Sequence, residues 1–282
     1  MRLLKFLIAF LACIVAAAAR SQTVSDSPGY QDFFYASGNL RIQAYLYKPD
    51  GDGPFPAVIY NHGSRDGHER VSMPFQYVGR MLARAGYVAL VPERRGYGKS
   101  DGEVWWKETG NDEGRLIVRL QAETDDVLAA VEYLRTVKSV DSGRLGIMGW
   151  SFGGIVTMLA VGRSGAFRVA VNQAGGALSW DGSPVLRDAL AGAARKTATP
   201  TLLMVARNDR TTSSITTLAD IFKTRGLPHQ MVIYEPFTPR PGTRVLAPGH
   251  AVFSAQGLGV WETDVVRFLG RYLGATAKPG PD

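Results

Sequence analysis

The sequence predicts an α/β protein with a mostly parallel central sheet flanked by helices. Apolar runs of strand length alternate along the chain with segments of helical periodicity, which is the order of a βαβ architecture. Most of these runs are continuously apolar, as strands covered on both faces of a parallel sheet are. The 282 residues, of which 45% are hydrophobic, suit one large globular domain or two small ones.

Strands are expected where apolar runs end in glycine, proline or polar clusters. The first, at 40–49, alternates like a half-exposed strand, and the first strand-like segments are expected to form an antiparallel edge. Buried strands, some running into a loop, are then expected within 55–63, 87–98, 144–150, 167–176, 199–209 and 229–237.

Helices are expected between these strands, where apolar residues recur at helical spacing. They fall at 73–86, 118–136, 152–161, 213–226 and 260–273. Residues 175–199 are expected to form the largest irregular insertion, which leaves room for a small cap at most. One α/β domain is therefore expected at 30–273, followed by a flexible tail at 274–282.

The first residues have the pattern of a signal peptide rather than of a folded element. Arg2 and Lys5 precede an apolar run from Phe6 to Ala19, and small residues close it. The run has 14 residues, short of the roughly 20 that a membrane-spanning helix needs. We expect residues 1–19 to be removed, with cleavage near 19–21, and the protein to be exported to the periplasm or secreted. An uncleaved anchor and a lipoprotein are the alternatives.

Composition narrows the classes of partner and chemistry. The single cysteine, Cys13, lies in the expected signal, so the mature chain offers neither a disulfide framework nor a thiol nucleophile. The formal net charge is +7, but the basic residues are scattered rather than clustered, which does not favour nucleic-acid binding. No stable membrane insertion is expected after signal cleavage, and the sequence does not indicate an oligomeric state.

The segment GRLGIMGWSFGG passes from an apolar strand into a helix through Gly-Trp-Ser-Phe-Gly. This spacing is that of a nucleophile elbow, with Ser151 in a strained turn and glycines at 149 and 153 because side chains there would clash with the chain. The alternative for Ser151 is a helix N-cap. A nucleophilic serine needs a base and an acid that orients the base.

His250 is the expected base, because it lies in a loop after the last strand and before the last helix. His229 begins a strand at the opposite end of the sheet, His68 lies on a polar loop, and His62 is expected to shape the oxyanion loop. A surface-loop role is the alternative for His250.

Asp209 is the expected acid, because it directly follows an apolar strand and gives the chain order Ser, Asp, His. Glu235 ends the next strand and is the fallback, while Asp181 and Asp188 in the insertion are poorer candidates. The backbone N–H groups of Phe152 and Ser64 are the expected oxyanion donors, with Gly63 allowing a tight turn.

The motifs VIYNHGS, RRGYGKSDG, DSGRLGIMGWSFGG, ARND and PGH, in that order, resemble the α/β-hydrolase superfamily. The likeness is greatest to dienelactone-hydrolase-like members and to the catalytic domain of prolyl-oligopeptidase-type enzymes, and it covers roughly 30–273. It implies an α/β-hydrolase fold and Ser151, Asp209 and His250 as a catalytic triad. Dienelactone hydrolases proper carry a cysteine where this chain has Ser151. Few residues precede Phe55, so the size-gated peptide cleavage of oligopeptidases is not expected.

Candidate substrate contacts come from the polar clusters and tryptophans that follow the strands. Arg65, Arg94, Trp150 and Trp180 are the residues chosen; an arginine there could hold a substrate carboxylate, and a solvated or ion-paired loop is the alternative. Trp105 and Trp106 are further candidates for an apolar pocket wall. The spacing of histidines and acids suggests no metal site, and no cofactor is expected.

These residues together predict an exported serine hydrolase that cleaves small-molecule carboxylic esters through an acyl-enzyme. A peptidase or amidase of the prolyl-oligopeptidase type is the alternative within enzymes. A non-catalytic binding protein on the same fold is the alternative outside them.

Overall fold

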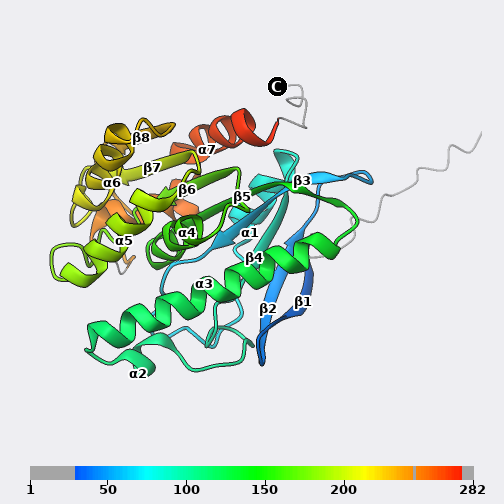
Figure 1. The fold of residues 1–282 in the computed structure, drawn as a ribbon, viewed down its shortest axis with the longest axis horizontal. Coiled ribbons are helices and arrows are strands. Elements are labelled where there is room, and N and C mark those ends of the chain that lie inside the picture. The colour runs from blue at the N-terminus through cyan, green and yellow to red at the C-terminus, as the bar shows by residue number, and fades with distance from the viewer. Residues whose placement is uncertain (1–28, 244–245, 275–282) are drawn as a thin grey trace, which may run out of the picture.

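The computed structural model describes residues 29–243 and 246–274, and it forms one eight-stranded sheet covered by helices (Figure 1). The signal peptide expected at 1–19 lies outside the described residues, as does the tail after Gly274. Within the described part, no helix is both long and apolar enough to span a membrane. The α/β class predicted from the sequence is confirmed.

The strands lie in the order β1-β2-β4-β3-β5-β6-β7-β8. The β1–β2 and β2–β4 pairs are antiparallel, and the remaining pairs are parallel. Their bounds are β1 (Gln31–Ser37), β2 (Leu40–Tyr47), β3 (Phe55–Asn61), β4 (Val88–Pro92), β5 (Val140–Trp150), β6 (Val169–Gln173), β7 (Thr201–Ala206) and β8 (His229–Tyr234). The antiparallel edge is therefore confirmed.

Helices connect the parallel strands and cover both faces. Figure 1 shows α3, α4 and α5 side by side on one face, and α1 packs against α7 on the other. The helices are α1 (Gln76–Arg84), α2 (Trp105–Thr109), α3 (Glu113–Thr136), α4 (Phe152–Arg163), α5 (Pro184–Lys196), α6 (Ser213–Thr224) and α7 (Leu258–Leu273). Two 3₁₀ turns, η1 (Pro248–Phe253) and η2 (Ala255–Gly257), precede α7.

Two sequence expectations need correction. Residues 175–199 are not an irregular insertion, because α5 fills most of the segment, with Ser183 as its N-cap and Pro184 in its first turn. Parallel neighbours β6 and β7 need a crossover, and α5 supplies it. The strand expected at 40–49 is not half-exposed: β2 is buried from Ile42 to Tyr47, because helices α1 and α3 cover this edge together with β1.

The chain leaves β3 for β4 on one side and returns past β3 to β5 on the other. The order therefore reverses between β3 and β5, and such a switch point opens a crevice at the carboxyl ends of the strands. The loops after β3 and β5 begin at His62 and Ser151 respectively. The topology thus places the polar loops that follow β3 and β5 around one crevice.

Candidate active site

Ser151 lies between the end of β5 and the start of α4 in a left-handed conformation, with φ 58° and ψ −120°. Such a conformation costs a non-glycine residue on the order of 1–3 kcal/mol and persists where the surroundings enforce it. Here a β-carbon added at Gly153 would lie 1.9 Å from the Asn61 oxygen, and one at Gly149 would lie 2.3 Å from the Gly153 oxygen. Both glycines therefore let the chain fold back tightly enough to present Ser151.

His250 and Asp209 meet although 41 residues separate them in the sequence. The His250 Nδ1 lies 2.7 Å from the Asp209 Oδ2, and the backbone N–H of Arg210 donates to the Asp209 Oδ1 at 2.7 Å. Both side chains are buried. The carboxylate is thus fixed on both oxygens, and it fixes the imidazole with its Nδ1–H toward the acid.

The other ring nitrogen of His250, Nε2, is buried and has no hydrogen-bond partner among the described residues. His250 and Ser151 both line a cavity of about 820 Å³ at the carboxyl edge of the sheet. The ring of Trp150 packs against the His250 imidazole, with 5.6 Å between ring centroids. An imidazole nitrogen that is free to accept a proton therefore lies in the same cavity as the strained serine.

The two residues whose backbone N–H groups are the expected oxyanion donors, Phe152 and Ser64, lie in the segments that flank Ser151. Phe152 is the first residue of α4, so its N–H has no acceptor within the helix. Gly63 lies directly against the serine, since a β-carbon there would be 3.2 Å from the Ser151 Cβ. Ser64 follows in the same loop and also lines the cavity.

His62 orients the Gly63–Ser64 peptide. Its Nε2 accepts from the Arg94 backbone N–H at 3.2 Å, so its Nδ1 carries the proton and donates to the Gly63 carbonyl at 2.7 Å. This peptide is trans, so the Ser64 N–H points opposite to the bonded carbonyl. Burial, followed by the Arg94 and Arg65 guanidinium groups, lowers the pKa of His62 well below its usual value, which keeps this tautomer neutral.

The four predicted substrate contacts are not all at the cavity. Arg65 and Trp150 line it, and Arg65 forms an ion pair with Glu93 and donates to the Val71 carbonyl at 2.9 Å. Burial raises the pKa of the Glu93 carboxyl, which the Arg65 guanidinium opposes.

Arg94 and Trp180 do not line the cavity, which corrects the prediction for both. Arg94 is buried in an ion pair with Glu123, at 3.2 Å. Trp180 packs into the hydrophobic core beside α5, because apolar burial there outweighs exposure at the cavity.

Most of the apolar wall of the cavity is not evident from the sequence. Of the two further tryptophans predicted for that wall, Trp105 lines the cavity and Trp106 is exposed. Leu116 and Leu120 from α3, together with Ile155 from α4 and Leu186 from α5, complete the apolar surface. Their spacing of four on α3 was visible, but an apolar helix face facing a cavity has the same pattern as one facing the core.

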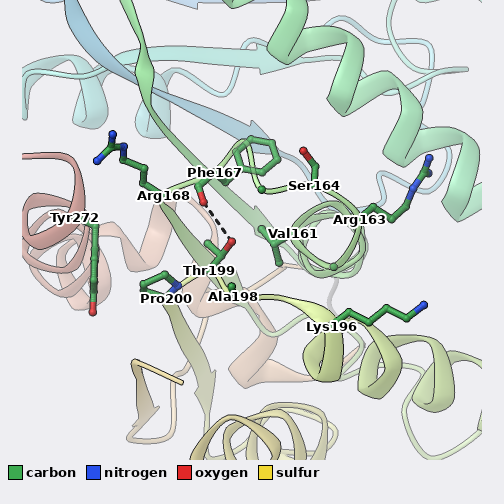
Figure 2. Close-up of a pocket in the computed structure, with 12 residues that line it drawn as sticks. Val161, Arg163, Ser164, Phe167, Arg168, Lys196, Ala198, Thr199, Pro200 and Tyr272 are labelled. Atoms are coloured by element: carbon green, nitrogen blue, oxygen red, sulfur yellow. Dashed lines mark hydrogen bonds between the residues drawn. The ribbon is translucent and has the colours of Figure 1, made fainter. Parts of the chain in front are cut away.

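A second cavity of about 550 Å³ lies at the opposite edge of the sheet, around the starts of β6 and β7 (Figure 2). Arg163, Arg168 and Lys196 line it, and the Thr199 hydroxyl there donates to the Phe167 carbonyl at 3.2 Å. It contains no member of the Ser151, His250 and Asp209 set. Among the described residues, no group of histidines, cysteines and acids has the arrangement of a metal site.

The fold of the chain is that of the α/β-hydrolases, as its motifs imply and as solved structures bear out. Residues 74–182 match the model of the prolyl oligopeptidase family.

Three similar proteins illustrate the range of relatives. A putative carboxymethylenebutenolidase of Methylorubrum extorquens is 29% identical over 46% of this chain and 43% of its own. The acylaminoacyl peptidase of Pyrococcus horikoshii superposes with a TM-score of 0.65 at 19% identity, covering 90% of this chain and 43% of its own. An esterase of Pyrococcus furiosus superposes with a TM-score of 0.62 at 17% identity, covering 87% of this chain and 91% of its own.

The matched part spans 36% and 16% of the lengths of two other curated relatives, so the chain corresponds to a fraction of each. Peptidases and esterases both occur among the matches.

Proposed function

We propose that the protein is a serine hydrolase that cleaves carboxylic esters, with Ser151, His250 and Asp209 as its catalytic triad. The observation that carries this is the His250–Asp209 contact of 2.7 Å, together with an unpartnered His250 Nε2 in the cavity that Ser151 lines. The same relation between a serine, an oriented imidazole and a carboxylate activates serine nucleophiles on unrelated folds.

In the proposed reaction, the Ser151 oxygen attacks the substrate carbonyl while His250 Nε2 takes the hydroxyl proton. The carbonyl oxygen gains negative charge, which the N–H groups of Phe152 and Ser64 stabilise. His250 then gives the proton to the departing alcohol, leaving an acyl group on Ser151. Water, deprotonated by His250, attacks that acyl group and restores the serine. No cofactor takes part.

The cavity supports a small-molecule substrate. A volume of about 820 Å³ lies within the range of ordinary ligand pockets. The apolar side chains of Trp105, Leu116 and Leu120 suit a hydrocarbon portion of the ester, and Arg65 is already engaged by Glu93.

The test is the hydrolysis of p-nitrophenyl acetate by the protein without residues 1–19. We expect Ser151→Ala to abolish hydrolysis, with a fall in kcat on the order of 10³-fold or more. A fluorophosphonate probe is expected to label the parent protein and not the variant. Hydrolysis by Ser151→Ala at the parent rate would contradict the proposal, and a parent protein that resists the probe would favour a non-catalytic binding role.

A peptidase or amidase is the second candidate, and the match of residues 74–182 to the prolyl oligopeptidase family favours it. Esters and anilides of the same acyl group separate the two candidates, because both need the same acyl pocket and differ in the bond that breaks. Faster cleavage of the ester by several orders of magnitude supports an esterase. Comparable values of kcat/KM would support a peptidase.

Export to the periplasm or medium is also part of the proposal, and it rests on residues 1–19 of the sequence. N-terminal sequencing of the protein recovered from outside the cytoplasm is expected to begin near residue 20. Recovery of the intact N-terminus from the cytoplasm would contradict it.

A further inference from the structure

The Arg94 side chain lies behind the expected oxyanion donors, in a position that the proposed triad does not use. Its guanidinium carbon lies 4.1 Å from the centre of the Phe152 ring and 4.5 Å from that of Tyr97. The side chain is 5% exposed. Phe152 lines the cavity and Arg94 does not.

Arg94 also contacts the loop that carries the second donor. Its Nη1 donates to the His62 carbonyl at 3.4 Å, and its backbone N–H donates to the His62 Nε2 at 3.2 Å. His62 in turn holds the Gly63 carbonyl, whose peptide supplies the Ser64 N–H. One residue therefore contacts both Phe152 at the start of α4 and the loop after β3.

We propose that Arg94 is a positioning residue that sets the distance between the two oxyanion donors, an inference that rests on the proposed function. The donors belong to separate elements, and their spacing must match one oxygen atom in the transition state. A planar guanidinium can stack on an aromatic ring while its edge donates to a carbonyl, which a lysine ammonium cannot do with the same geometry.

The guanidinium is itself fixed from α3. Its Nε lies 3.2 Å from the Glu123 Oε2, and the other Glu123 oxygen accepts from the Arg119 Nε at 2.7 Å. Arg119 also donates to the backbone carbonyls of Glu103 and Arg95, at 2.8 and 2.6 Å. A buried ion pair contributes little net stability, because the cost of removing both charges from water offsets their attraction. Stability alone therefore does not account for the Arg94–Glu123 pair, whereas a role in positioning the oxyanion donors does.

The experiment compares Arg94→Lys with Arg95→Lys. Lysine at 94 keeps a cation for Glu123 and loses the flat face on Phe152. We expect kcat for p-nitrophenyl acetate to fall roughly 10- to 100-fold, with KM changed less than about twofold, since misplacement of about 1 Å costs that much. A phenylboronic acid, which mimics the tetrahedral intermediate, is expected to bind more weakly by a similar factor. Arg95 is the matched control, because its side chain pairs with Asp126 on the same helix, α3, at 2.7 Å rather than with Phe152 or the loop after β3.

A fall in kcat shared equally by both variants, or a rise in KM alone, would overturn the inference, because either would indicate general destabilisation or a role in substrate binding. Crystal structures of the parent and Arg94→Lys provide a readout that needs no catalysis. We expect the Phe152 ring or the Gly63–Ser64 peptide to shift in the variant, and unchanged positions of both would also overturn it. Failure of the parent to hydrolyse esters and amides would count against the proposed function, and the structural comparison would still decide the role of Arg94.

Discussion

At the scale of single residues, two acids compete for the role of orienting His250. Asp209 follows β7 and Glu235 follows β8, so the sequence makes both of them candidates. The Asp209 carboxylate lies 2.7 Å from the imidazole, whereas the Glu235 side chain is 82% exposed and pairs with Arg207. Chain order alone could not separate them, because strand ends on neighbouring strands lie close together in space.

We therefore expect Asp209→Asn to lower kcat by about 10³- to 10⁴-fold while KM changes little. The amide keeps the volume of the carboxylate but no longer stabilises the imidazolium that forms when His250 takes the proton. Ester hydrolysis over a range of substrate concentrations measures both parameters. Glu235→Gln is the control and is expected to match the parent protein. A large fall in kcat for Glu235→Gln, with Asp209→Asn active, would reverse the assignment.

At the scale of elements, helix α4 depends on close approach to the end of β3. The β-carbon that alanine would add at Gly153 lies 1.9 Å from one backbone oxygen, that of Asn61, and 2.6 Å from another, that of His62. Neither atom is the end of a flexible side chain, so α4 or the loop after β3 must move. Gly153 therefore controls both the packing of helix α4 and the position of the loop after β3.

Gly153→Ala is expected to lower the free energy of unfolding by about 1–3 kcal/mol, through overpacking against backbone. Gly192→Ala provides a matched control on helix α5, because an added β-carbon there meets nothing within 4 Å. The control is expected to raise stability by up to about 1 kcal/mol, since alanine favours a helix more than glycine does. Urea denaturation measures both, and equal effects of the two substitutions would contradict the packing argument.

At the scale of the whole molecule, the local sequence pattern predicted which segments are strands and which are helices. The pairing of the edge strand and the burial of single side chains depend on contacts between residues distant in the sequence. The continuous apolar runs at β3 and β5 to β7 identified a buried parallel sheet, and the order of motifs identified the edge where Ser151, Asp209 and His250 gather. Strand β1 was not predicted separately, because its apolar run, Phe33 to Ala36, is short and only the pairing with β2 defines it as a strand. The buried position of Arg94 depends on Glu123 from a separate helix, which spacing along the chain does not show.

The stability of the whole fold is expected to depend on pH through His62. Burial and two nearby arginines lower its pKa in the folded protein, while the unfolded chain has a pKa of about 6.5. Below about pH 6.5 the unfolded chain therefore binds the extra proton, and stability falls as the pH falls, by about 1.4 kcal/mol per pH unit, until the folded pKa is reached. The Glu93 Oε2 lies 3.7 Å from the His62 Nε2, and burial raises the pKa of the Glu93 carboxyl. The stability that Glu93 contributes is therefore present at low pH and is lost as the pH rises.

His62→Asn isolates this contribution, because the asparagine amide can still donate to the Gly63 carbonyl and does not titrate, while Glu93 is present in both proteins. Urea denaturation of the parent and the variant between about pH 7.5 and about pH 5 gives their free energies of unfolding. We expect the parent to be the more stable protein at the upper end and its advantage to shrink as the pH falls below about 6.5. Parallel pH profiles for the two proteins would mean that the folded state does not exclude the proton from His62.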